Sequence, residues 1–220
     1  MDTVEMARNS PTTVAPRAPA GRFDAAQALR PGQYVWEHSG TPPIRIHLLF
    51  VPCQVVEVRI AVHRAQGHDI RLSFGLCHDT VEFGELVGNG FDRPALHRKG
   101  YGTLAVNVAL QAIQSICPPC TRIKGVLSNV DEAHLPLDQR HTLAENRRAF
   151  WRRFGVSVIT NWEGADHLDG AVGDLRIVPG GTVGSLDGRV VPLSEFRFSK
   201  PDSPPRKNRA YLSDSSTRHW

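Results

Sequence analysis

The first half of the chain alternates between apolar and polar residues, and a period of two predicts half-buried β-strands. Four strands are expected, over residues 45–51, 55–62, 69–77 and 80–91. In the second and third of these strands the apolar positions share one face, and they are Val56, Val58, Ile60 and Val62, then Ile70, Leu72, Phe74 and Leu76. The short turn between these two strands predicts a hairpin. Glycines interrupt the last strand, where they are typical of a bulge or a close backbone approach, at Gly84, Gly88 and Gly90.

After residue 100 the spacing of apolar residues becomes helical. A recurrence every four residues predicts a helix through Leu104, Val108, Ala112 and Ile116. A strand is expected over residues 122–128. Thr142 and Glu145 then form an S/T-x-x-E capping box, which predicts that a second helix starts there.

The second predicted helix runs to Phe154, with Gly155 just past its end. Its apolar stripe consists of Leu143, Phe150 and Phe154, and four arginines occupy most of the rest. Three further strands are expected, over residues 156–160, 174–178 and 189–193. The order of four strands, helix, strand, helix and strands indicates an α+β fold, or a mixed α/β sheet.

Composition and charge divide the chain into a domain and two tails. The 220 residues are 40% hydrophobic and 22% charged, as is usual for a globular protein. The net charge of +4 lies in the ends, since residues 1–31 carry four Arg against three acids and residues 199–220 carry five Lys or Arg against two. Both ends are rich in Pro, Ser, Thr and Ala. We therefore expect a disordered tail over 1–31, one domain over 32–198 and a disordered basic tail over 199–220. The neutral domain argues against nucleic acid as a partner, although the basic tail keeps such contact open.

Several classes of protein are disfavoured by what the sequence lacks. No apolar run approaches the length of a membrane span, and the N-terminus has no apolar stretch of a signal peptide. The sequence therefore predicts a cytoplasmic protein without a membrane partner, whose four cysteines are reduced. Cys117 and Cys120 form a CPPC motif, but no second pair of zinc ligands accompanies it. We interpret this motif as a tight turn and expect no metal site.

The stretch LHRKGYGTLAV, residues 96–106, joins a predicted strand to a predicted helix. The first N–H groups of a helix have no partner within it, and the helix dipole favours an anion there. Gly100 and Gly102 would let phosphate oxygens come close to these N–H groups. Side chains that add positive charge precede the glycines, and they are His97, Arg98 and Lys99. The stretch predicts a pyrophosphate site, with a purely structural turn as the alternative; its spacing is that of neither the P-loop nor the dinucleotide-binding loop.

Two segments resemble the GNAT superfamily of acyl-CoA N-acyltransferases. HRKGYGTLAVNVAL (97–110) resembles the family's coenzyme A pyrophosphate loop and helix, and ENRRAFWRRFGV (145–156) resembles its later helix, with the strand RIKGVLSN (122–129) between them. The resemblance covers about residues 70–160. It implies an acyl-CoA N-acyltransferase-like fold, with a central, mostly antiparallel sheet and a strand–loop–helix site for coenzyme A. It further implies acetyl-CoA as the acyl-CoA cosubstrate, held by His97, Arg98, Lys99, Gly100, Tyr101, Gly102, Thr103 and Trp151.

The activity that the resemblance implies is direct attack of an amine on the thioester. The acceptor, a small molecule or a protein, stays unidentified. In the family a glutamate on the strand before the loop can act as the base, which nominates Glu85 first and Glu82 second. Residues three apart face opposite sides of a regular strand, and a bulge at Gly84 would change that.

The chain departs from the family pattern in ways that keep two functions open. Trp151 stands where many members have the tyrosine that protonates the leaving thiolate, and an indole has no acidic hydroxyl. Ser128 and Tyr101 are the candidates that could protonate the thiolate in its place. The family usually has two helices between its first two strands, and they help to shape the acceptor site. The only helix candidate ahead of the strand 45–51 is residues 23–30, so we expect fewer elements around the acceptor site than in the family. The alternatives are an active N-acetyltransferase and a non-catalytic GNAT-like module that binds coenzyme A or a macromolecule. Nucleic-acid binding through the basic tail is a third.

Overall fold

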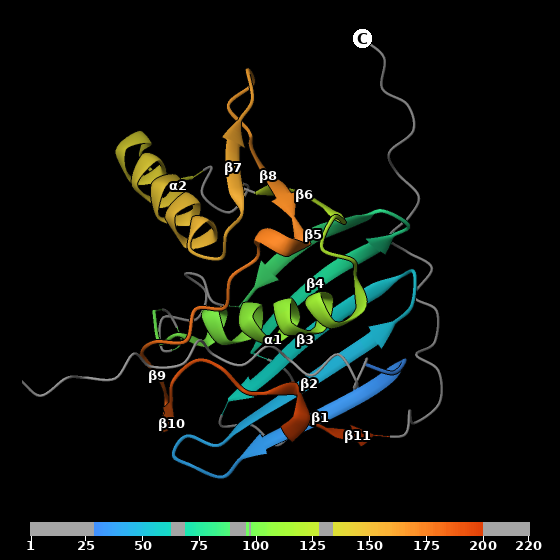
Figure 1. The fold of residues 1–220 in the computed structure, drawn as a ribbon. Helices are drawn as coiled ribbons and strands as arrows, with labels where there is room; N and C mark the ends of the chain where they lie inside the picture. Colours follow the sequence, from blue (N-terminus) through green and yellow to red (C-terminus); the bar gives the residue numbers. More distant parts are fainter. Residues whose placement is uncertain (1–28, 63–68, 89–95, 97, 128–133, 200–220) are drawn as a thin grey trace, which may run out of the picture.

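The computed structural model describes residues 29–62, 69–88, 96, 98–127 and 134–199. These residues form one large, mostly antiparallel sheet with two helices, so the expectation of an α+β fold is confirmed (Figure 1). The strands, in their order across the sheet, are β11 (Arg197–Ser199), β1 (Gly32–His38), β2 (Ile44–Val51), β3 (Val55–Val62), β4 (Ile70–Cys77), β5 (Thr80–Val87), β6 (Arg122–Leu127), β8 (Asp166–Ala171) and β7 (Ser157–Thr160). The helices are α1 (Tyr101–Ile116) and α2 (Leu137–Arg152). A short hairpin, β9 (Thr182–Val183) with β10 (Leu186–Asp187), precedes β11.

The core lies between the centre of the sheet and α1. The cross-strand rows of β2, β3 and β4 place apolar side chains opposite one another, for example Leu48, Val58 and Leu72, all fully buried. Helix α1 lies across β3 and β4 on this face (Figure 1). The predicted alternation and the β3–β4 hairpin are therefore confirmed. The opposite face of the same strands carries polar residues.

Helix α1 is buried on both sides, because the C-terminal segment packs along the face turned away from the sheet. Asn107 is fully buried and bonds this segment through its amide: Nδ2 donates to the carbonyl oxygens of Val178 (2.9 Å) and Arg189 (2.7 Å), and Oδ1 accepts from the N–H of Val178 (2.9 Å). One and two turns further along the helix, Gln111 donates to the carbonyl of Val191 and Gln114 to that of Leu175. The side-chain amides of Asn107, Gln111 and Gln114 thus form the hydrogen bonds to the backbone of this segment that a neighbouring strand would otherwise form.

Helix α2 is attached through an aromatic cluster at its C-terminal end. Trp151 is 4% exposed, and its ring centroid lies 5.2 Å from that of Phe83 on β5 and 5.4 Å from that of Phe150. The predicted start at a capping box of Thr142 and Glu145 is wrong, since Pro136 holds the N-cap position. Thr142 lies in the second turn, where its hydroxyl donates to the carbonyl of Asp138 (3.0 Å). The helix ends at Arg152, two residues before the predicted end at Phe154.

Other boundaries differ from expectation for identifiable reasons. β5 ends at Val87 rather than at residue 91, and residues 89–91 lie outside the described part of the chain. Residues 174–178 and 189–193 are not strands, because the side chains of α1 bond their backbone in place of a sheet. The strands β1, β8 and β11 were not predicted from the pattern.

The predicted tails, and the helix candidate at residues 23–30, lie outside the described residues except for Leu29, Arg30, Pro31 and Ser199. Within the described residues, neither helix is long and apolar enough to cross a membrane. The CPPC motif does form a turn: α1 ends at Ile116, and the N–H of Thr121 donates to the carbonyl of Pro118 (3.0 Å). All four cysteines are free thiols, as expected.

Candidate site at the separation of two parallel strands

The one parallel pair among the described strands, β5 with β6, is paired over only part of its length. It runs from Thr80 opposite Arg122 to Phe83 opposite Gly125. Beyond that point β5 continues to Val87 alongside β4, and β6 continues to Leu127 alongside β8. The two strands are therefore not paired with each other beyond Phe83 and Gly125. Strand edges that separate leave backbone N–H and C=O groups available to a ligand.

A β-bulge sits on β5 at this separation. Phe83 pairs with Phe74 and Leu86 pairs with Leu72, so that Gly84 and Glu85 together face the single residue Ser73. A Cβ atom on residue 84 would lie 2.7 Å from both the carbonyl oxygen and Oγ of Ser73, which explains the glycine.

The bulge decides how the two candidate bases are placed. Phe83 and Leu86 both face the core side, because they are the partners of core-facing residues of β4. Glu82 and Glu85, each adjacent to one of them, lie together on the opposite, open face, and both are exposed. The expectation of opposite sides holds for a regular strand and is corrected here by the extra residue.

The glycine turn before α1 has a left-handed backbone at two positions. Arg98 and Gly100 both adopt positive φ, at 56° and 87°, and Gly100 occupies the N-cap position. Arg98 and Lys99 are exposed, and His97 lies outside the described residues. No side chain of the described residues caps the helix, so a ligand anion would not compete with an existing cap.

The first turn of α1 is more enclosed than the sequence suggested. Gly102 is buried, and Tyr101 and Thr103 are 3% and 4% exposed. The cause is the β9–β10 segment, since a Cβ on Gly100 would lie within 3.1 Å of Thr182 and Val183. Burial raises the pKa of the Tyr101 hydroxyl, and the nearby charge of Asp69 adds to the effect. Tyr101 is therefore held protonated.

Arg189 brings a positive charge to this turn that no sequence pattern indicated. Its side chain lies between two glycines: a Cβ on Gly100 would be 3.0 Å from Nε, and a Cβ on Gly181 would be 2.6 Å from one terminal nitrogen. The Nε atom is buried and has no hydrogen-bond partner among the described residues. A buried donor without a partner is costly. An anion at the glycine turn would provide that partner, and the charges of Arg98, Lys99 and Arg189 suit a pyrophosphate there, although Thr182, Val183 and Arg189 already fill the space beside Gly100.

Trp151 does not lie where the resemblance implies that it would contact the ligand. It is a buried member of the aromatic cluster with Phe83, Phe150 and Phe154 and lies behind β5 rather than at the surface. An indole N–H is a donor only and has no titratable proton near neutral pH. Ser128, one of its two possible substitutes, lies outside the described residues.

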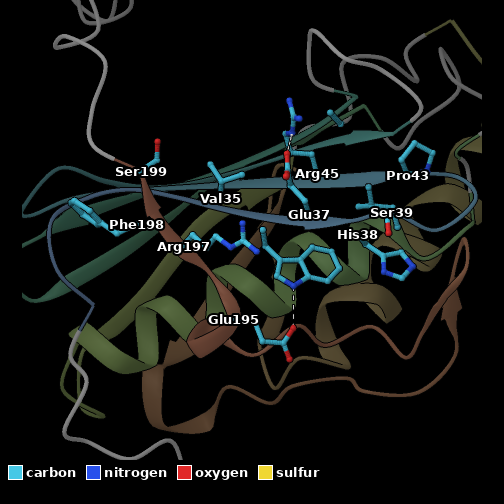
Figure 2. Close-up of a pocket in the computed structure, with 13 residues that line it drawn as sticks. Val35, Glu37, His38, Ser39, Pro43, Arg45, Glu195, Arg197, Phe198 and Ser199 are labelled. Atoms are coloured by element: carbon cyan, nitrogen blue, oxygen red, sulfur yellow. Dashed lines mark hydrogen bonds and ion pairs between the residues drawn. The ribbon is translucent and has the colours of Figure 1, made fainter.

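A cavity lies elsewhere in the structure. It measures about 870 Å³ and is found around β1 and β11, where Trp36 Nε1 donates to a carboxylate oxygen of Glu195 (3.0 Å) and Arg197 lies alongside (Figure 2). Three strands separate β1 from β5, which is roughly 19 Å at the usual strand spacing. None of the site residues predicted from the sequence lines this cavity.

Among the described residues no group of three or more His, Cys, Asp or Glu side chains is arranged to hold a metal ion. Comparisons with protein-family models, with curated proteins and with solved structures found no match.

Proposed function

We propose that this protein is an acyl-CoA-dependent N-acyltransferase that transfers an acetyl group to an amine. The observation that carries the proposal is the parallel pair β5–β6, which is connected through the glycine turn and α1 and separates after Phe83. The extended, amide-bearing pantetheine arm of coenzyme A matches the unpaired strand edges, and the pyrophosphate of coenzyme A matches the positively charged turn. The order of strand, glycine turn, helix and strand is the one that the GNAT resemblance implies for these segments.

The residues that would hold acetyl-CoA divide by its parts. Arg98 and Lys99 are exposed beside the turn, and Arg189 offers its unpartnered Nε–H from the other side. These three side chains would neutralise a pyrophosphate at the start of α1, where the dipole adds its own favourable contribution. The edge of β5 beyond Phe83 would bond the pantetheine and polarise the thioester carbonyl.

The transfer needs a neutral amine next to the thioester. The amine nitrogen forms the new bond to the acyl carbon, the C–S bond breaks, and the amine proton passes to a base. Glu85 and Glu82 are exposed on one face at the bulge, which makes them suitable carriers of that proton. The thiolate is reprotonated by solvent, because Tyr101 is 3% exposed and its raised pKa makes its hydroxyl a weaker acid.

A second candidate function is supported by the enclosure of the site. Trp151 supplies no acid, and the first turn of α1 is buried under the β9–β10 segment. The first observation favours a domain of the same architecture that binds coenzyme A without catalysis, and the second favours one that binds another partner. Measuring ligand affinity and turnover on the same variants separates the two candidates.

The test is acetyl-CoA binding by calorimetry and product formation by mass spectrometry, both on the full chain. Arg189→Gln should weaken acetyl-CoA binding roughly tenfold, about 1.4 kcal/mol. Arg197→Gln, which removes the same charge from the far edge of the sheet, should leave the affinity unchanged. Glu85→Gln should lower turnover with affinity retained if the protein is an enzyme. A wild-type protein that binds no acetyl-CoA at millimolar ligand would refute the proposal.

A further inference from the structure

The open face of the sheet, on the side away from α1, carries an unusual distribution of charge next to the bulge. The pairing of β2, β3 and β4 places His47, Arg59 and Arg71 in one cross-strand row on this face. In the next row Leu49, Glu57 and Ser73 stand side by side, and Ser73 faces the bulge of β5. This face has no described helix over it, because both α1 and the C-terminal segment lie on the other side.

Arg59 and Arg71 face each other directly across β3 and β4. Like charges at directly opposed positions destabilise a sheet. Glu57 offsets this repulsion, since its Oε1 accepts from Nε of Arg59 and lies 3.6 Å from Nε of Arg71. The Glu57 side chain is 9% exposed, whereas those of Arg59 and Arg71 are 41% and 59% exposed. One buried carboxylate therefore orients two exposed guanidinium groups and leaves them with an excess positive charge.

The neighbouring strand β5 carries the complementary charge. Glu82 and Glu85 are exposed, and neither forms an ion pair with another described residue. Glu85 lies opposite Ser73, which makes it a diagonal neighbour of Arg71, at roughly 7–8 Å between backbone positions. Glu82 has Lys124 of β6 opposite it. Arg71 and Glu85 lie within the length of one small molecule and form no ion pair with each other.

We propose that the acceptor of this enzyme is a primary amine that also carries an anionic group, a carboxylate or a phosphate. The inference rests on the proposed function. The amine would meet Glu85 and Glu82 at the strand separation, and the anion would meet Arg71 and Arg59. Guanidinium groups bind carboxylate and phosphate through paired N–H donors, and Glu57 engages chiefly Nε, so the terminal nitrogens are left to such an anion.

A third arginine on the same face carries no excess positive charge. Arg45 faces Glu37 across β1 and β2 and donates to its carboxylate, so one positive charge is matched by one negative charge. It lies two strands further from β5 than Arg71 does. Arg45 is therefore the matched control, because it has the same side chain, the same face and similar exposure, at 45%.

The experiment measures direct binding of matched ligand pairs to the full chain, by calorimetry and with coenzyme A present and absent. One pair is L-leucine and 3-methylbutylamine, which differ only in the carboxylate. The other is O-phosphoethanolamine and ethanolamine, which differ in the phosphate. At least one anionic member should bind roughly tenfold more tightly than its partner amine. The pair that shows the preference identifies the anion.

Variants then locate the preference. Arg71→Gln and, separately, Arg59→Gln should each reduce the preference by a factor of several, with little change for the bare amine. Arg45→Gln should retain it. Equal affinity within both pairs, no binding up to roughly 10 mM, or equal loss in Arg45→Gln would each overturn the inference. Acetyl-CoA affinity, measured on the same preparations, distinguishes the two proposals. A protein that does not bind acetyl-CoA refutes the proposed function and with it the acceptor role. A protein that binds acetyl-CoA but shows no preference for the anionic ligands refutes only the inference.

Discussion

Asn107 is the residue on which the attachment of the C-terminal segment depends most. It lies in the middle of α1, is fully buried and exchanges three hydrogen bonds with the backbone of Val178 and Arg189. Its replacement by alanine removes all three bonds and leaves two carbonyl groups and one N–H group without that partner. The segment concerned also carries Arg189 and encloses Gly100.

The size of the effect follows from the number of bonds. A hydrogen bond of this kind contributes about 1 kcal/mol net, so Asn107→Ala should lower the free energy of unfolding by about 3 kcal/mol. With a slope near 2 kcal/mol per molar urea, as expected at this size, the urea midpoint should fall by about 1.5 M. Gln114→Ala removes a single bond from an exposed side chain and should cost no more than about 1 kcal/mol.

The assay is urea unfolding followed by circular dichroism and by tryptophan fluorescence, with coincident transitions as the check for two-state behaviour. Acetyl-CoA affinity of the folded variant should fall as well, since Arg189 would lose its backbone anchor. A loss for Asn107→Ala no larger than that for Gln114→Ala, at an unchanged slope, would refute the reasoning. It would mean that the packing of apolar residues, and not the amide of Asn107, holds the segment.

Three further predictions concern the bulge, an ion pair and the cysteines. Gly84→Ala should destabilise the protein by roughly 2 kcal/mol, because the added Cβ would meet Ser73. Gly75→Ala is the control and should cost less than about 1 kcal/mol, since the nearest atom to its added Cβ would lie 3.6 Å away. Equal losses of unfolding free energy in chemical denaturation would contradict this packing effect. Burial alone would raise the pKa of Asp166, but its hydrogen bonds with Arg148 and Thr160 and the charge of Arg148 lower it below the ordinary 3.8. This carboxylate therefore stabilises the fold above about pH 4 and stops doing so as the pH falls through its lowered pKa. Asp166→Asn should cost about 2 kcal/mol at neutral pH and progressively less in acid, and a pH-independent difference in unfolding free energy would argue otherwise. Cys117→Ser combined with Cys120→Ser should keep the fold and any activity, and stoichiometric zinc in the purified wild type, lost in this variant, would show that the CPPC turn has another role.

The elements with regular periodicity were predictable because each is specified by its own residues. The apolar faces of β3 and β4 follow from a period of two, and their predicted positions are buried. In α1 the predicted Leu104, Val108 and Ala112 are buried too, but so is every residue from Tyr101 to Ile113. The glycine turn at Gly100 was also readable, since its positive φ depends on a local backbone preference. Among the candidate site residues, Glu82, Glu85, Arg98 and Lys99 were named from the sequence, and the structure places them on β5 and at the start of α1.

The tertiary structure decided what depends on partners distant in the chain. β8 has the polar sequence DHLDGA, which hides a strand, and Asp166 is buried there because Arg148 of α2 and Thr160 of β7 bond it. The bulge that brings Glu82 and Glu85 to one face exists only relative to the register of β4. Arg189 reaches the glycine turn because Asn107, some eighty residues earlier, bonds its backbone. Local preference determines a strand or a turn, but register, buried ion pairs and long-range anchors are set by which segments pack together, and no pattern within one segment contains that information.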